Sequence, residues 1–282
     1  MPKSRSKAPL ARRARAKAKP AAKPSKRTPA QARPKPGSKR APARKRPQAP
    51  IELYFWPTYN GFKISIMLEE CRLPYVLKPV NINRGEQFDP HFLSISPNNR
   101  MPAIVDPAGP GGRSISTFES GAILQYLAEK TGKFMPRDLR GRFEVMQWLF
   151  WQMANLGPVS GHNNHFANYA VDKYDYAIKR FRDETNRLYA VMDKRLADRE
   201  YLAGDYSIAD MACYPWTVPY ERYGQNLDDF PNMKRWWTTM QNRPGVKRAY
   251  EVGTQYRGVP ATDPEARKIL FGQTAETVRR GG

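Results

Sequence analysis

Three short stretches of the sequence could form a ligand site, and two of them place polar side chains where they could bind an anion. Thr58 and Asn60 lie in a turn before a predicted helix and offer a hydroxyl and an amide N–H. Ser120 follows Glu119 where another helix is predicted to begin, so its hydroxyl would stand beside free backbone N–H groups and the positive end of the helix dipole. Met101-Pro102 directly precedes a predicted strand. Taken alone, Glu119-Ser120 also fits an ordinary helix cap, and Met101-Pro102 an ordinary loop.

Other chemistries have little support in the sequence. His162 and His165 have the i, i+3 spacing of a metal-binding pair, but no third ligand is evident nearby, so we predict no metal. Cys71 and Cys213 are too few for a disulfide framework or a zinc site, and we expect both to be small core residues. The sequence has neither a Walker motif nor a dinucleotide-binding glycine loop.

The elements that would position the anion-binding residues follow the order β-α-β-α-β-β-α over residues 51–132. Alternating strand formers predict a strand at 51–55, and the spacing of Ile64, Met67 and Leu68 predicts a helix over 62–70. The later elements are a strand at 75–80, a short helix near 90–93, a strand ending at 106, a strand at 114–117 and a helix from 118 to about 130. This order is the thioredoxin arrangement, so we predict a thioredoxin-like α/β domain.

Residues 133–255 are predicted to form an all-α domain, a C-terminal helical bundle. Apolar residues recur at helical spacing over 139–155, which predicts a helix with one apolar face, and its aromatic residues 148, 150 and 151 are expected in the core. Ser207 and Asp210 have capping-box spacing, which we interpret as structural. The last helix is expected to begin at Pro244, and residues 256–282 form an extension without a recognisable motif.

Positive charge is concentrated at the N-terminus of the 282-residue chain, whose formal net charge is +22. Residues 1–50 hold 18 basic residues, no acidic residue and no aromatic residue. Such a stretch cannot bury enough apolar surface to offset its ordering entropy, so we predict a disordered tail. It resembles the tails of linker histones and would bind nucleic acid without sequence preference, in a salt-sensitive way. The alternative is a solubilising extension.

No stretch approaches the roughly 18 consecutive apolar residues of a transmembrane helix, and no secretory signal is recognisable. We therefore expect no membrane association and an intracellular, cytoplasmic location. Nucleoid association through the basic tail is a further expectation.

In combination, these motifs make the chain resemble the glutathione transferase family. Met101-Pro102, Glu119-Ser120 and the Ser207–Asp210 segment carry the resemblance, which extends over about residues 51–250. The segments 57–61, 96–99 and 118–124 are similar to the Nu class, which includes bacterial disulfide-bond reductases and a yeast nitrogen-regulatory prion protein. The resemblance implies a homodimer that uses glutathione as co-substrate.

The resemblance also implies roles for individual residues. Ser120 and Glu119 would bind the γ-glutamyl carboxylate and ammonium of glutathione. Pro102 would be a cis-proline that exposes the Met101 backbone to the tripeptide, which would pair with it like an added strand. The remaining implied roles are Arg100 and Gln87 at the glycyl carboxylate, Arg180 at a second glutathione, and Tyr59 and His165 in the substrate cleft.

The loop after the first strand, 56–60, contains no cysteine, so a thioredoxin-type dithiol is excluded there. The reactive sulfur must then come from glutathione. Thr58, Asn60 and the backbone amides near Gly61 are the donors that would stabilise its thiolate, which is the nucleophilic form. By the resemblance, the thiolate attacks a disulfide and a second glutathione resolves the mixed disulfide, with peroxide reduction as a side activity and conjugation to electrophiles a weaker one.

Three functions remain open at this stage. The chain could be a glutathione-dependent disulfide reductase, a non-catalytic regulator with the same fold, or a nucleic-acid-associated protein that works through its tail. The cysteine-free loop with its hydrogen-bond donors favours the enzyme.

Overall fold

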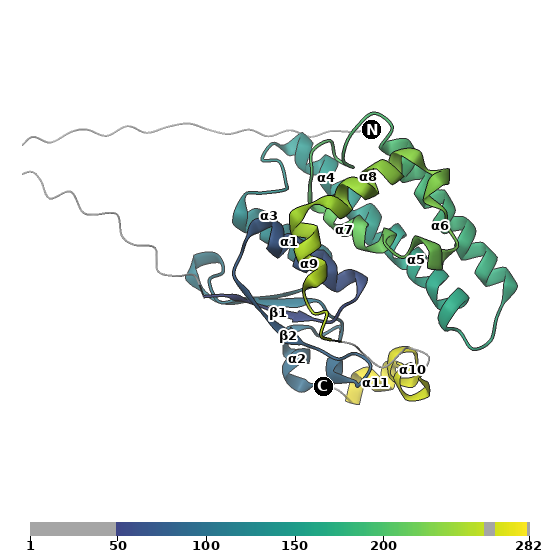
Figure 1. Ribbon diagram of the computed structural model, residues 1–282. Helices are drawn as coiled ribbons and strands as arrows, with labels where there is room; N and C mark the ends of the chain where they lie inside the picture. Colours follow the sequence, from purple (N-terminus) through teal and green to yellow (C-terminus); the bar gives the residue numbers. More distant parts are fainter. Residues whose placement is uncertain (1–48, 257–262, 281–282) are drawn as a thin grey trace, which may run out of the picture. The chain divides into compact units, whose positions relative to one another are not determined.

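The computed structural model describes residues 49–256 and 263–280 (Figure 1). All but the last two residues of the predicted tail lie outside these ranges. The strands are β1 (Ile51–Phe55), β2 (Tyr75–Pro79), β3 (Ala103–Asp106) and β4 (Ile115–Phe118). The helices are α1 (Tyr59–Cys71), α2 (Pro90–Ile95), α3 (Ser120–Thr131), α4 (Leu139–Trp151), α5 (Gly157–Asn164), α6 (Asp175–Arg195), α7 (Ile208–Thr217), α8 (Pro231–Asn242), α9 (Pro244–Glu251), α10 (Pro264–Phe271) and α11 (Ala275–Arg280).

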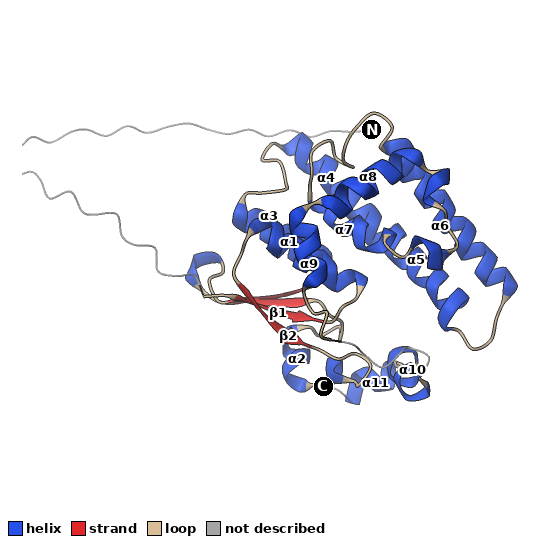
Figure 2. Cartoon of the chain, viewed as in Figure 1, coloured by secondary structure: helices blue, strands red, loops and turns tan. Residues whose placement is uncertain are grey.

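The sheet has the strand order β2-β1-β3-β4, with β1 and β2 parallel and the other two pairs antiparallel. Figure 2 shows α1 on one face of the sheet and α2 on the other. α1 also packs against α3, α7 and α9, so it lies between the sheet and the helical half. The predicted thioredoxin-like domain followed by helices is confirmed.

Two apolar clusters hold this arrangement together. The larger joins the α1 and α3 side of the sheet to the helical half, and each fully buried aliphatic or aromatic side chain in it contributes about 1.5–3 kcal/mol. Cys71 and Cys213 are buried in it, as predicted. The smaller cluster lies under α2 and contains Tyr54 and Phe92, whose ring centroids are 5.8 Å apart. The Tyr54 ring therefore faces away from α1.

The helical half differs from the prediction at three places. The helix expected over 139–155 is α4 followed by a π-helical turn, η3 (Gln152–Leu156). Half of its predicted apolar face is exposed, because Phe143 and Phe150 are 60% and 61% accessible while Met146 and Met153 are partly buried, so Phe150 is not a core residue. α9 is not the last helix, since α10 and α11 follow.

Within the described ranges, none of the helices has the length and apolar character needed to cross a membrane.

Asp210 anchors the first turn of α7. Its carboxylate accepts hydrogen bonds from the Leu202 N–H (3.0 Å) and the Trp236 indole (2.9 Å), and from the backbone N–H (3.0 Å) and hydroxyl (3.1 Å) of Ser207. The predicted capping box is confirmed. Complete burial raises the pKa of the Asp210 carboxyl to about 6, although these four donors favour the ionised form. One side chain thus holds the start of α7, the preceding loop and α8.

Substituting this shared acceptor should weaken the whole helical half. Asp210→Ala leaves the Leu202 N–H and the Trp236 indole buried without partners, so the free energy of unfolding should fall by about 2–5 kcal/mol. Urea unfolding followed by tryptophan fluorescence measures this. Asp138, which caps α4 through an exposed bond to the Gly141 N–H, is the control, and Asp138→Ala should cost only about 1 kcal/mol. Equal losses in the two variants would contradict this account of Asp210.

Candidate functional site

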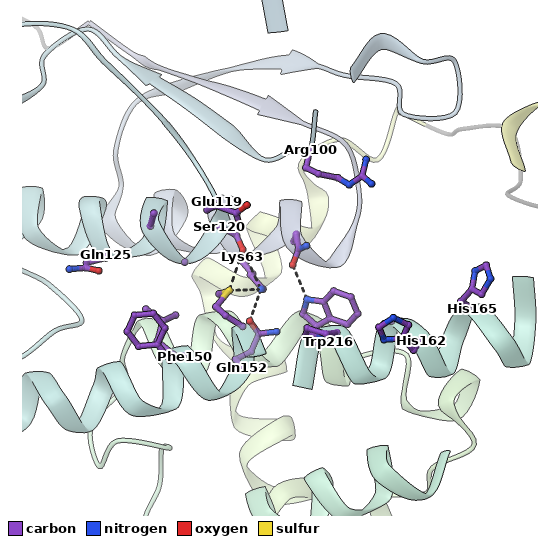
Figure 3. Close-up of a pocket in the computed structure, with 18 residues that line it drawn as sticks. Lys63, Arg100, Glu119, Ser120, Gln125, Phe150, Gln152, His162, His165 and Trp216 are labelled. Atoms are coloured by element: carbon purple, nitrogen blue, oxygen red, sulfur yellow. Dashed lines mark hydrogen bonds between the residues drawn. The ribbon is translucent and has the colours of Figure 1, made fainter. Parts of the chain in front are cut away.

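Two adjoining cavities form a cleft between the thioredoxin-like half and the helical half. They measure about 890 and 540 Å³ and share five lining residues, Asn60, Arg100, Glu119, Ser120 and Trp216. The larger cavity runs along α4 and α5 (Figure 3). Of the residues predicted for the site, the cleft brings together Thr58, Tyr59, Asn60, Arg100, Met101, Pro102, Glu119, Ser120 and His165.

The start of α1 presents hydrogen-bond donors to the smaller cavity. Thr58 caps the helix, because its hydroxyl oxygen accepts from the Gly61 N–H at 3.2 Å, and the same hydroxyl lies 3.6 Å from the Met101 sulfur. The Asn60 amide oxygen accepts from the Trp216 indole at 2.9 Å. Because that oxygen is occupied, the NH₂ group of Asn60 is the part of the amide that can serve a ligand. The first turn of α1 can therefore stabilise a negative charge with side-chain donors and the helix dipole.

The start of α3 forms the opposite wall. Glu119 occupies the N-cap position with a φ of 67°, a left-handed conformation that is uncommon outside glycine, and its side chain makes no capping bond. Its carboxylate instead accepts from the Asn98 amide at 3.2 Å. Glu119 therefore does not form the ordinary side-chain helix cap that the sequence alone would allow. Ser120, 6% exposed, is the first residue of α3.

A buried lysine, Lys63, lies behind Ser120 and was not among the residues predicted for the site. Lys63 is 1% exposed, and its ammonium donates to the Gln152 amide oxygen (2.6 Å) and the Ser120 hydroxyl (3.3 Å), with the Met153 sulfur at 3.8 Å (Figure 3). Burial lowers the pKa of Lys63 to about 7. A signal was present, because Lys63 precedes Met67 by one helical turn and so shares its buried face.

The C-terminal extension closes one side of the smaller cavity. The Gln273 amide oxygen accepts from the Arg100 guanidinium at 2.7 Å and from the Asn99 amide at 3.2 Å. Phe271, at the end of α10, lines this cavity and packs edge-on against His165, with ring centroids 4.8 Å apart. Burial and the nearby His162, Arg267 and Lys173 lower the pKa of His165. A segment without a sequence motif therefore supplies part of the wall.

Two residues predicted for the site, Gln87 and Arg180, are not among the residues that line the two cavities, whereas Met101 and Pro102 are. Met101-Pro102 is a cis peptide bond, as expected, and lines the smaller cavity. Gln87, in contrast, is 2% exposed in a 3₁₀ turn. Arg180 on α6 is exposed and lies 3.5 Å from Glu184. Over residues 49–256 and 263–280, no three His, Cys, Asp or Glu side chains are grouped to hold a metal ion.

Comparison with known families matches both halves of the chain. Residues 49–129 match the glutathione S-transferase N-terminal domain, and residues 166–244 match the glutathione S-transferase C-terminal domain. The chain is 50% identical over 202 residues to the disulfide-bond oxidoreductase YfcG of Escherichia coli (strain K12), which covers 71% of this chain and 94% of that protein.

Solved structures of glutathione transferases are also similar to this chain. A glutathione transferase from Pseudomonas putida, with one glutathione disulfide bound per subunit, is 40% identical with a TM-score of 0.69 and covers 74% of this chain and 94% of its own. A family member from Pseudomonas fluorescens, with two glutathione molecules bound, is 43% identical with a TM-score of 0.68 and covers 71% of this chain and 92% of its own.

The close packing at the start of α1 generates a prediction about stability. A methyl group on Gly61 would lie 2.4 Å from the Trp56 carbonyl oxygen and 3.1 Å from the Phe55 ring, so the turn would have to move. Gly61→Ala should lower the free energy of unfolding by about 1–3 kcal/mol in thermal unfolding. Gly161→Ala is the matched control, because its methyl group would make ordinary contact, 3.5 Å from the Trp216 ring. If both variants unfolded at the wild-type temperature, the turn would not be tightly packed.

Proposed function

The chain belongs to the glutathione S-transferase family, and we propose that it is a glutathione-dependent disulfide-bond oxidoreductase. The observation that carries the proposal is the first turn of α1, which offers donors for a thiolate to a cleft but no cysteine. The two cysteines of the chain are buried in the core, and burial raises the pKa of both thiols. The reacting thiolate is therefore supplied by glutathione, the co-substrate.

The cleft supports one orientation of the tripeptide. Ser120 and Glu119, at the start of α3, bind the γ-glutamyl carboxylate and ammonium. The Met101 backbone, directly before Pro102 and near the start of β3, pairs with the central peptide groups. Arg100 binds the glycyl carboxylate. The thiol then lies near Thr58 and Asn60, which stabilise its ionised form.

Disulfide reduction then proceeds in two exchanges. The glutathione thiolate attacks one sulfur of the substrate disulfide, forming a mixed disulfide and releasing the other sulfur as a thiolate. A second glutathione thiolate attacks the glutathione sulfur of the mixed disulfide. The products are oxidised glutathione and the second substrate thiolate, so two glutathiones are oxidised for each disulfide reduced. Peroxide reduction by the same thiolate, and conjugation to electrophiles, are secondary activities.

The cleft has room for more than one ligand. Its larger cavity, about 890 Å³, is at the upper end of the range for small-molecule sites and holds the substrate or second glutathione beside His165, while Tyr59 lines the adjoining smaller cavity. Arg180 reaches that second molecule, and Gln87 supports the glycyl end of the first. These two roles rest on the family resemblance, since neither side chain lines either of the two cavities of the cleft.

A homodimer would cover the apolar side chains that α4 leaves exposed. Leu139, Phe143 and Phe150 are 60–71% accessible on this helix. Exposed apolar patches of this kind are typical of protein interfaces. Because Phe150 also lines the larger cavity, the partner would lie beside the cleft.

Removing the donors at the start of α1 tests the proposal. Thr58→Ala and Asn60→Ala should each lower kcat/KM for glutathione-dependent reduction of hydroxyethyl disulfide by roughly tenfold or more, because the bound thiolate loses a donor. The pKa of the bound thiol should rise, measured from thiolate absorbance. Thr58→Ser, which keeps the hydroxyl, and Tyr54→Phe, on the far face of the sheet, are the controls. Wild-type turnover in both alanine variants would reject the role of these residues, and no turnover in the wild type would favour the non-catalytic regulator.

The charge of residues 1–50 supports a second role for the chain, binding of duplex DNA without sequence preference. This role, a cytoplasmic location and nucleoid association remain proposals. Full-length protein should bind a random duplex at low salt, with affinity falling steeply as salt rises, and residues 51–282 should bind far more weakly in the same titration. Equal binding by both proteins would exclude the tail as the binding segment.

A further inference from the structure

The ammonium group of Lys63 is buried at the base of the cleft without a counter-ion. Its hydrogen-bond partners are the neutral side chains of Gln152, Ser120 and Met153. Within the described residues, no carboxylate lies within ion-pair distance of it. Buried lysines are normally paired with an acid, because an unpaired charge in the interior is costly. The missing partner suggests that the charge serves a ligand.

Among the described elements packed around Lys63, none places a carboxylate in contact with its ammonium group. Glu119, at the start of α3, and the Cys213 thiol on α7 are the titratable groups that act on it. The charge of Glu119 raises the pKa of Lys63, but its carboxylate is hydrogen-bonded to Asn98 and not to the lysine. Burial keeps the Cys213 thiol protonated by raising its pKa. η3 supplies only neutral groups.

Two arginines of the α9 region form ion pairs with glutamates of α1 and not with groups at Lys63. Arg243, which caps α9, and Arg248 pair with Glu70 and Glu69 near the C-terminal end of α1.

A second observation points to a ligand at the same place. Gln152 is fully buried, and its NH₂ group has no hydrogen-bond partner among the described residues, although its oxygen accepts from Lys63. Both residues line the larger cavity. The π-helical turn that presents Gln152 is a rare conformation that is frequent at functional sites. Lys63 and Gln152 together leave positive charge and an unused donor beside Ser120, a combination that suits a carboxylate.

We propose that Lys63 is the counter-ion of the γ-glutamyl carboxylate at Ser120, and that binding of this carboxylate is coupled to uptake of a proton by Lys63. The inference rests on the proposed function, which places glutathione at Ser120. The Lys63 nitrogen is 3.3 Å from the Ser120 oxygen. A carboxylate oxygen bonded to that hydroxyl lies within about 6 Å of the ammonium, where an opposite charge favours the protonated form.

The direction of the pH dependence follows from the two states. In the empty site, burial lowers the pKa of Lys63 to about 7, so part of the population is neutral at pH 7 and most of it at pH 8. The bound carboxylate raises this pKa again. Binding therefore takes up a proton above pH 7 and becomes weaker as the pH rises, by up to about tenfold per pH unit.

Calorimetric titration of the full-length protein with S-methylglutathione tests this coupling, since that probe has no ionisable thiol. Titrations in phosphate and in Tris, whose ionisation enthalpies differ, give the number of protons exchanged. We expect about one proton taken up per site at pH 8 and close to none at pH 6. An S-methyl analogue without the γ-glutamyl α-carboxylate should bind weakly and take up no proton.

Three variants complete the test. Lys63→Met should abolish proton uptake and leave a weak affinity that no longer depends on pH, whereas Lys63→Arg, which keeps the charge, should also take up no proton but bind at pH 8 at least as well as the wild type. Lys78→Met, an exposed lysine on β2, should behave as the wild type. Thermal unfolding of each variant shows whether it is folded.

The outcomes separate the two proposals. Proton uptake that persists in folded Lys63→Met, or binding by the wild type with no uptake at pH 8, would overturn this inference alone. Failure of the wild type to bind S-methylglutathione and glutathione at all would overturn the proposed function and the inference with it.

Discussion

The hydrogen bond from the Trp216 indole to the Asn60 amide joins the two halves of the chain where they form the cleft. Trp216 lies near the end of α7, and Asp210 fixes the start of that helix through the loop before it and through α8. The orientation of a side chain in the first turn of α1 thus depends on a buried carboxylate about 150 residues later in the sequence. The sheet supplies the scaffold for the site, but the helical half sets its geometry.

In the proposed function, the cleft stabilises two negative groups of glutathione at two different places, the thiolate at α1 and a carboxylate at α3. At α1, the Thr58 hydroxyl, the Asn60 amide and the helix dipole are the neutral groups that we propose stabilise the sulfur. At the start of α3, the helix N-terminus, the left-handed residue Glu119 and the buried Lys63 lie around Ser120, where we propose that the carboxylate binds. Because Lys63 lies on α1 and Ser120 on α3, packing of these two helices controls both ends of the arrangement.

Local patterns in the sequence were sufficient for much of the fold. The strand at 51–55 and the capping box of Ser207 and Asp210 depend on residues a few positions apart, and both are confirmed. Lys63 and Gln152 are 89 residues apart, and Arg100 and Gln273 are 173 apart, so no local pattern reports those contacts. The apolar stripe on α4 shows a different limit, because helical periodicity identifies an apolar face but does not say whether the rest of the chain buries it.

The contact between Gln273 and Arg100 has a thermodynamic consequence for ligand capture. An arginine side chain loses up to about 2 kcal/mol of rotamer entropy when it is immobilised. Gln273 holds the guanidinium at 2.7 Å, so that loss is part of folding and does not recur when a ligand arrives. A ligand carboxylate can replace the neutral amide oxygen of Gln273 as the acceptor. Its negative charge is shared by two oxygens, so the hydrogen bonds that Arg100 then donates are stronger. The end of the chain thereby preorganises an arginine that lies far from it in the sequence.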